Sequence, residues 1–360
     1  MYDYLIIGSG LFGSIFARQM TDRGAKCLVV DKRSHIGGNC YTRNVGGINV
    51  HEYGPHIFHT NSDTVWNYMN RWTKFNHYVN RPKVLYGDKL YSFPINLFTL
   101  YQLWGVKTPA EAHRKLQEVK VPISNPKNLE EWVLSQVGEE IYQKFVYGYT
   151  KKQWGRDPKD LPSFIIKRLP IRMTFDDNYY EDKYQGIPIG GYTAIFEKLL
   201  QGIDHEEGVD YMKDREHLER KAKKIVYTGP IDEFFGCDNG RLEWRSLRFE
   251  HETHDVEDYQ GNAIVNYTEE ATPYTRTCEH KHFEFGRQSH TVVTKEYPQN
   301  WDSNKEKFYP VNDEKNNEMY QQYKQRIDSS RHIFGGRLAD YKYYDMHQVV
   351  GSALARSDKE

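Results

Sequence analysis

The stretch Tyr4–Gly13, with the sequence YLIIGSGLFG, decides which fold this chain is expected to adopt. Its first four residues form an apolar run typical of a strand that is buried on both faces of a parallel sheet. Gly8, Gly10 and Gly13 then follow in the spacing GxGxxG. Between a strand and a helix, these glycines allow a tight turn, a close approach of backbone to a pyrophosphate, and close packing of helix on strand. An anion placed there meets the N–H groups at the start of the helix.

The residues that follow complete a β-α-β unit. Apolar residues recur at helical spacing over 11–20, and Gly24 ends the pattern. Cys27–Val30 is a second apolar run, and it ends at Asp31. Asp31 follows Gly8 by 23 residues, where a carboxylate can bind ribose hydroxyls. The sequence therefore predicts an α/β fold with a Rossmann-like dinucleotide-binding domain.

The segment after Asp31 favours FAD over NAD as the dinucleotide. Lys32 follows directly, and Gly37-Gly38-Asn39 begins six residues after Asp31. This pattern resembles the extended signature of the glutathione-reductase-like FAD family, in which two glycines let the backbone pass close to the flavin diphosphate. Because the chain has no second GxGxxG, a separate Rossmann domain for NAD(P)H is not expected.

The rest of the chain predicts further domains. Apolar runs return at Lys224–Tyr227 and Arg331–Phe334, which we expect to be strands of the nucleotide-binding sheet. Thr108–Glu111 is a capping box with proline at the first helical position. Residues 241–297 favour antiparallel sheet, whereas residues 37–59 predict an ordered loop. The expected domains are a discontinuous FAD-binding domain (1–75, 188–240 and 330–360), a helical insertion domain (96–168) and an antiparallel β-sheet domain (76–95, 169–187 and 241–329).

The composition excludes several classes of protein. A chain of 360 residues suggests two or three domains, and 49 Lys and Arg against 50 Asp and Glu exclude a chain-wide basic surface for nucleic acid. The 28 tyrosines suit a polar cleft, because each joins an apolar ring to a hydroxyl. No signal peptide and no membrane span is expected, so a cytoplasmic protein is predicted. Four cysteines lack the spacing of a zinc site and are expected to be small buried residues: Cys27, Cys40, Cys237 and Cys278.

Motifs spread along the whole chain resemble, in order and with matching gaps, those of the bacterial UDP-galactopyranose mutase family. They are Gly54–Thr60, Phe145–Gly155, Lys167–Pro170, Asp176–Tyr179, Tyr274–Arg276, Glu279–Phe283, Phe308–Asp313 and Gly335–Tyr341. The resemblance implies an isomerase that interconverts UDP-galactopyranose and UDP-galactofuranose, which supplies galactofuranose for surface polysaccharide. It also implies a homodimer.

The resemblance implies that FAD acts in its reduced form. In the family's mechanism, flavin N5 attacks sugar C1 and expels UDP, and a covalent flavin–sugar iminium intermediate opens and recloses the ring through the other hydroxyl. The reaction has no net redox change, so an external reductant is needed only to prime the flavin, and NAD(P)H is a candidate. The residues leave open whether UDP-N-acetylgalactosamine is also a substrate.

Several residues match the family's substrate contacts. Arg168 and Arg276 match its two diphosphate arginines, and a guanidinium suits this role because its charge is permanent and its contacts to phosphate are bidentate. Tyr149, Tyr309 and Tyr343 match tyrosines whose hydroxyls contact phosphate. The other matches lie around the uracil, the nucleotide or the sugar, or on a mobile substrate loop of the helical domain: Asn80, Phe145, Thr150, Trp154, Tyr179 and Asn266.

A further group matches residues beside the flavin. His59 could hydrogen-bond the flavin or the sugar, and Arg337 would stabilise an anionic reduced flavin. Asp345 is placed near the flavin or the sugar, with simple capping of the last helix as the alternative. The expected FAD-binding residues are Gly8, Gly10, Leu11, Phe12, Gly13, Asp31, Lys32, Gly37, Gly38, Asn39, His56, Ile57, Gly336, Arg337, Asp345 and Met346. The expected catalytic residues are His59, Arg168, Arg276, Tyr309, Tyr343 and Asp345, and no metal is expected.

Two other functions are compatible with an FAD fold. An oxidoreductase such as an amine oxidase or a desaturase usually builds an apolar, aromatic-lined cavity, whereas the pair Arg168 and Arg276 suits a nucleotide diphosphate better. A non-catalytic flavin-binding protein would not need that pair. The sequence therefore favours the isomerase.

Overall fold

The computed structural model of the chain describes residues 1–163 and 171–360. These residues form two compact units. Unit 1 comprises Met1–His77, Asp182–Trp244 and Lys307–Glu360, and unit 2 comprises Tyr78–Glu181 and Arg245–Glu306.

Unit 1 is built on a parallel sheet of five strands in the order β16-β10-β1-β2-β9. β1 lies at the centre, with β2 on one side and β10 on the other. Leu5 and Ile6 of β1 are completely buried, which confirms the prediction of a strand covered on both faces. The bounds are β1 (Tyr2–Ile7), β2 (Cys27–Asp31), β9 (Asp204–Glu207), β10 (Ala222–Tyr227) and β16 (His332–Phe334).

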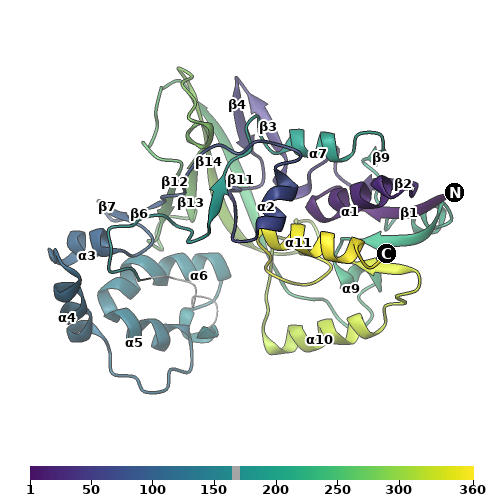
Figure 1. The fold of residues 1–360 in the computed structure, drawn as a ribbon. Helices are drawn as coiled ribbons and strands as arrows, with labels where there is room; N and C mark the ends of the chain where they lie inside the picture. Colours follow the sequence, from purple (N-terminus) through teal and green to yellow (C-terminus); the bar gives the residue numbers. More distant parts are fainter. Residues whose placement is uncertain (164–170) are drawn as a thin grey trace. The chain divides into compact units, whose positions relative to one another are not determined.

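Two helices from opposite ends of the chain lie side by side in unit 1. They are α1 (Leu11–Asp22) and α11 (Met346–Ser357), drawn in purple and yellow in Figure 1. Ile15 and Phe16 of α1 share one apolar core with Val350 of α11. The remaining helices of unit 1 are η1 (Gly38–Cys40), α2 (Asp63–Met69), α7 (Thr193–Leu199), α8 (Arg215–Glu219), α9 (Ile231–Phe234) and α10 (Glu314–Gln325).

Short strands occupy part of the segment that was expected to be a loop. β3 (Thr42–Val45) and β4 (Ile48–His51) form an antiparallel hairpin, so the prediction of a loop over 37–59 is wrong for these residues. The hairpin closes on Gly46 and Gly47, which both have positive φ, as a tight turn between two strands requires. β5 (Phe58–Thr60) pairs with β8 (Tyr184–Gly186), far away in the sequence.

Unit 2 contains a mixed sheet. Its strands run in the order β11-β14-β13-β12-β6-β7. The pairs β11–β14, β14–β13, β13–β12 and β6–β7 are antiparallel, as predicted, but β12 pairs with β6 in parallel. The bounds are β6 (Lys83–Tyr86), β7 (Lys89–Ser92), β11 (Trp244–His254), β12 (Ile264–Tyr267), β13 (Arg276–Glu279) and β14 (Thr291–Asn300), and η5 (His280–Glu284) follows β13.

The helices of unit 2 begin at the residues that the sequence marks as caps. The Thr108 hydroxyl accepts from the backbone N–H of Glu111 at the start of α4, and the Asn128 side chain caps α5 in the same way. These helices enclose a second apolar core. The bounds are α3 (Leu97–Trp104), α4 (Pro109–Val119), α5 (Leu129–Ile141), the π-helical turn η2 (Tyr142–Tyr147), α6 (Gly148–Trp154) and η3 (Pro158–Asp160).

The structure bears on two expectations from composition: the absence of a membrane span and the burial of all four cysteines. None of the helices formed by residues 1–163 and 171–360 combines the length and the apolar character needed to cross a membrane. Cys27, Cys40 and Cys278 are buried thiols, as predicted, whereas Cys237 is half-buried.

Candidate active site

Two glycine segments of unit 1 meet backbone to backbone. A Cβ on Gly13 would lie 1.9 Å from the carbonyl oxygen of Gly8, and a Cβ on Gly38 would lie 3.0 Å from the Cα of Gly10. The backbone N–H of Gly37 donates to the carbonyl of Ser9 at 3.1 Å. The two glycine segments can approach each other this closely only because Gly13 and Gly38 carry no side chains, and we call the backbone that they form the glycine cradle. Such a cradle fits the diphosphate of a dinucleotide.

Asp31 holds the first glycine segment in place. Its Oδ2 accepts from the backbone N–H and the hydroxyl of Ser9, at 2.8 and 2.7 Å, and its Oδ1 accepts from the backbone N–H of Arg33. The carboxylate is buried at the end of β2, where the sequence placed it. Nearby, Lys32 is exposed, and the Asn39 side chain accepts from the Arg33 guanidinium at 3.0 Å.

The C-terminal glycine pair lies against the start of α1. A Cβ on Gly335 would lie 2.1 Å from the ring of Phe12, and Gly336 has φ +91° beside the same ring. Leu11 and Phe12 are buried in the core of unit 1. The structure thus brings the expected glycines 8–13, 37–38 and 335–336 of unit 1 together.

Arg337 faces two of the predicted tyrosines. Its guanidinium carbon lies 6.0 Å from the centre of the Tyr309 ring and 5.6 Å from that of Tyr343. The two rings stack on each other with centroids 5.0 Å apart, and Tyr343 is 42% exposed. The Nε of Arg337 donates to the carbonyl of Tyr344 at 3.2 Å. A cation beside two tyrosine rings, of which that of Tyr343 is exposed, is suited to an anionic ligand.

His59 stands in a cluster of titratable side chains. Its Nδ1 is bonded to the carboxylate of Asp182, and its ring packs edge-on against His347 with centroids 4.9 Å apart. Nitrogen or oxygen atoms of His59, Asp345 and His347 lie within 4.8 Å of one another. Asp182 and His347 were missed by the sequence analysis, because Asp182 lies far from His59 in the chain and His347 lies within an ordinary helical pattern.

His56, Ile57 and Asp345, which were expected beside the flavin, lie in contacts that fix the local backbone. The backbone N–H of His56 donates to a ring nitrogen of His51 at 3.0 Å, and the Tyr192 hydroxyl donates to the carbonyl of His56. Ile57 is buried. Asp345 occupies the N-cap position of α11, where its N–H donates to the Gln348 side chain, so capping is part of its role.

Met346 begins α11 beside a buried thiol. Its sulfur lies 3.7 Å from the sulfur of Cys40, which belongs to η1 directly after the Gly37-Gly38 pair. Burial raises the pKa of the Cys40 thiol to about 12. This contact joins the last helix of unit 1 to the second glycine segment.

In unit 2, two predicted substrate residues are neighbours across two strands. Asn266 of β12 and Arg276 of β13 are register partners. Asn266 is buried and its amide donates to the carbonyl of Lys83 at 3.2 Å. Arg276 keeps 22% of its side chain exposed and pairs with Glu296. The two side chains therefore belong to one rigid piece of sheet.

The expected base-binding residues have unequal exposure. Phe145 is 4% exposed and packs edge-on against Tyr91 in the core of unit 2, whereas Tyr179 is 40% exposed. The backbone N–H of Tyr179 donates to the carbonyl of Asn80, whose side chain is buried and meets the Tyr78 hydroxyl. Within unit 2, Tyr179 thus offers a ring surface that a base could stack on, and Phe145 supports the core.

Helix α6 carries three of the residues that were predicted to bind substrate. It is anchored by Lys152, which was not among the predicted site residues. Tyr149 and Trp154 are half-buried, and Thr150 is buried. The Lys152 ammonium donates to four backbone carbonyls between β12 and β13, at 2.7 to 3.0 Å: those of Tyr267, Glu269, Thr272 and Tyr274. Burial lowers the pKa of Lys152 to about 8.

The C-terminal end of α6 has a second cation. The Nε of Arg245 donates to the carbonyl of Gln153 at 2.8 Å, and its Nη2 donates to that of Lys152 at 3.2 Å. Arg245 is 6% exposed. Lys152 thus ties α6 to the segment that joins β12, which carries Asn266, to β13, which carries Arg276, whereas Arg245 ties the end of α6 to β11. Arg168, the second predicted diphosphate arginine, lies outside the described residues.

Comparison with known proteins identifies the family. Residues 144–343 match the family described as "GLF: UDP-galactopyranose mutase", and residues 6–72 match "NAD(P)-binding Rossmann-like domain". A dTDP-fucopyranose mutase of Escherichia coli is 39% identical, over 98% of this chain and 97% of the relative. A probable UDP-galactopyranose mutase of Klebsiella pneumoniae is also 39% identical, over 99% of this chain and 94% of the relative.

Solved structures share the fold. The crystal structure of a reduced UDP-galactopyranose mutase matches with a TM-score of 0.75 and 14% identity, over 99% of this chain and 95% of that chain. A putrescine oxidase matches with a TM-score of 0.59 and 10% identity. The fold is therefore a mixed α/β architecture with a Rossmann-like domain of the kind that binds NAD(P) or flavin. With the mutase relatives covering the full chain, this protein belongs to the UDP-galactopyranose mutase family of isomerases.

Proposed function

We propose that the chain binds FAD and, with the flavin reduced, interconverts UDP-galactopyranose and UDP-galactofuranose. The observation that carries the proposal is Arg337 above the stacked rings of Tyr309 and Tyr343, in the unit that also holds the glycine cradle. The full-length identity to two sugar mutases supports the reaction class.

FAD fits the chain on structural grounds. Its diphosphate would lie on Gly10, Gly13 and the N–H groups that begin α1. Asp31 would hold the glycine segment in position next to the adjoining ribose. When bound and reduced, the flavin supplies a nucleophilic nitrogen for the anomeric carbon of the sugar. Arg337 would stabilise negative charge near the flavin or the leaving diphosphate.

The protein's own groups bind the nucleotide and hold its charge. Arg276 can offer its planar fork to the diphosphate, because one side of the guanidinium is held by Glu296 and the side chain stays partly exposed. Tyr309 and Tyr343 can donate their hydroxyls to phosphate oxygens, and Asn266 is positioned beside Arg276. Arg168 is proposed as the second clamp. These contacts would keep the nucleoside diphosphate in place while the sugar ring opens and recloses.

We further propose a cytoplasmic homodimer that serves surface polysaccharide synthesis and is primed by NAD(P)H.

A second substrate is favoured by a specific observation. The E. coli relative that acts on a dTDP-fucopyranose has the same 39% identity as the Klebsiella relative that is named for UDP-galactopyranose. dTDP-fucopyranose is therefore the alternative substrate.

One assay decides between these functions. The protein reduced with dithionite is incubated with UDP-galactofuranose, and separately with dTDP-fucopyranose and UDP-N-acetylgalactosamine, and the products are separated by chromatography. We expect the UDP-sugar to equilibrate with reduced protein and not with oxidised protein. Turnover by oxidised flavin with stoichiometric hydrogen peroxide would reject the isomerase in favour of an oxidase. If the reduced protein converts dTDP-fucopyranose faster than the UDP-sugar, dTDP-fucopyranose replaces the UDP-sugar as the proposed substrate.

A further inference from the structure

His59 and Asp182 are joined through two strands that are paired in unit 1. His59 lies on β5 and Asp182 lies two residues before β8, and the strands pair with His59 opposite Gln185. The side chains are 10% and 18% exposed. One oxygen of the Asp182 carboxylate contacts the Nδ1 of His59, and the other contacts the amide nitrogen of Asn61. A carboxylate is thus held against a nearly buried imidazole.

Asn61 determines the direction of these hydrogen bonds. Its Oδ1 accepts from the backbone N–H of Lys183 at 2.8 Å, which places its amide nitrogen on the side of Asp182. That nitrogen can only donate, so the Asp182 oxygen it meets is an acceptor. An ionised carboxylate accepts at both oxygens, so His59 is the donor on the other side. The geometry therefore assigns the proton to Nδ1 of His59.

The tautomer determines what His59 can do on its other face. With the proton on Nδ1, a neutral imidazole has its lone pair on Nε2. Asp345 and His347 of the last helix lie close to the same ring. The same carboxylate–imidazole arrangement orients histidines in hydrolase triads and in metal sites.

We propose that Asp182, held by Asn61, is a positioning residue for His59 and fixes its Nδ1–H tautomer. The effect of this tautomer on the reaction rests on the proposed function, but the tautomer itself does not. It requires no metal and no reactant beyond the nucleotide sugar.

The tautomer can be read without turnover. Protein labelled with ¹⁵N-histidine is examined as isolated by two-dimensional ¹H–¹⁵N NMR, and the His59 signals are identified by their loss in His59→Asn. We expect a pyrrole-type nitrogen at Nδ1 and a pyridine-type nitrogen at Nε2 in the neutral ring. In Asp182→Asn, the Nδ1–H form should lose its dominance. An Nε2–H tautomer in the unsubstituted protein would overturn the proposal.

Kinetics tests the consequence of the tautomer. Asp182→Asn should lower kcat by about 10- to 100-fold, the usual effect of removing the carboxylate behind a functional histidine, while KM changes by less than about threefold. Asp182→Glu should restore part of kcat. The matched control is Asp63→Asn, because Asp63 bonds Lys183 and Tyr184 on the same strand pair at the surface. We expect this control to leave kcat and the His59 signals unchanged.

The outcomes separate this proposal from the function it rests on. If the reduced protein converts none of the nucleotide sugars, the proposed function fails, and the NMR experiment still decides the role of Asp182 in fixing the ring. If the protein is active and Asp182→Asn retains full kcat, Asp182 is not a positioning residue for the reaction.

Discussion

Arg276 and Glu296 face each other across β13 and β14, with Nη2 of the arginine 3.1 Å from Oε1 of the glutamate. Glu296 is 2% exposed, whereas the arginine side chain is 22% exposed. A buried carboxylate therefore anchors one side of a guanidinium whose other side can reach a ligand. Any substitution of Arg276 therefore acts on the buried anion and, under the proposed function, on the ligand as well.

Arg276→Ala should lose activity about a hundredfold, because it removes a charge from the diphosphate clamp, while FAD remains bound. It should also lower the free energy of unfolding by about 3 kcal/mol, because the buried Glu296 is left without its partner. Turnover assays, flavin absorbance and urea unfolding measure the three effects. The double variant Arg276→Ala/Glu296→Gln should regain stability but not activity. If the double variant regains activity, Arg276 affects the reaction only by stabilising the sheet and does not contact the diphosphate.

Lys152→Met should loosen the segment between β12 and β13, since it removes the ammonium that donates to four carbonyls. We expect a loss of about 1–3 kcal/mol in unfolding free energy and a roughly tenfold rise in KM for the nucleotide sugar. The matched control is Lys151→Met. Lys151 pairs with Glu270 at 2.7 Å on the same segment but at the surface, where such a pair contributes about 0–1 kcal/mol. Equal effects of both substitutions would contradict a special role for Lys152.

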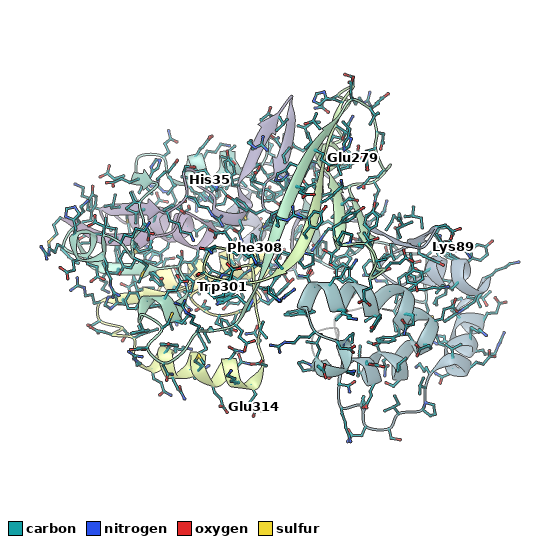
Figure 2. All side chains as sticks on the ribbon, turned by 180° about the vertical axis from the view of Figure 1, so that it is seen from behind. His35, Lys89, Glu279, Trp301, Phe308 and Glu314 are labelled. Carbon is teal, nitrogen blue, oxygen red and sulfur yellow. The ribbon has the colours of Figure 1, made fainter. Side chains whose placement is uncertain are left out.

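Glu279 should make the stability of unit 2 depend on pH. Its carboxylate is completely buried at the end of β13 and is labelled in Figure 2. Burial alone would raise its pKa, but hydrogen bonds from His282 and from the backbone N–H groups of Tyr259 and Gln260 lower the pKa from 4.5 to about 2. A lowered carboxyl pKa stabilises the folded state above about pH 4.5, and this contribution is lost as the pH falls toward 2.

Glu279→Gln should therefore unfold more easily near neutral pH, by about 1–3 kcal/mol, and the difference from the unsubstituted protein should disappear in acid. Urea unfolding at several pH values measures this difference. Asp258→Asn is the control, because Asp258 is the exposed partner of His282. A constant difference between pH 7 and pH 3 would mean that Glu279 acts by packing and not by its charge.

Gly13→Ala should abolish FAD binding, because a Cβ there would lie 1.9 Å from the carbonyl oxygen of Gly8. The glycine segment would have to move away from the place where the diphosphate is proposed to bind. Gly351→Ala provides the control, since Gly351 also lies in a helix and a Cβ would come no closer than 3.8 Å to Val65. That substitution should keep the flavin and add up to about 1 kcal/mol of stability. Flavin absorbance after gel filtration and thermal unfolding compare the two. If purified Gly13→Ala is yellow, and therefore still holds flavin, the proposed diphosphate site at the glycine cradle is wrong.

The sequence predicted the parts of the fold in which local pattern and burial agree. β1, α1 and β2 carry continuous or periodic apolar residues, and all three lie where expected. β9 was missed, because its four residues Asp204–Glu207 are exposed and charged, as is common at a sheet edge. The β3–β4 hairpin was missed because the glycines and histidines of this segment favoured a loop.

From the sequence, the site residues could be predicted only where they belong to a recognisable motif. The glycines meet in the structure because each motif encodes a backbone conformation. Tyr309 and Arg337 come from two motifs of the same unit, and Tyr343 lies two residues after the second of them. Asp182 could not be found in this way, because its contact with His59 depends on the pairing of β5 with β8. Lys152 was visible within a motif, yet its four carbonyl partners are backbone atoms that no side-chain pattern reveals.

The strand order of the five-stranded sheet has a consequence for biosynthesis. β1 leaves the ribosome well before its neighbour β10, which begins at Ala222, and before the edge strand β16, which begins at His332. The sheet beside the glycine segment after β1 is therefore complete only once β16 has been synthesised. During that interval the apolar faces of β1 and β2 are exposed to other chains, and pairing over such long separations is slow. Nascent chains of this protein should depend on chaperones, and the proposed flavin should be captured only after β16 has emerged.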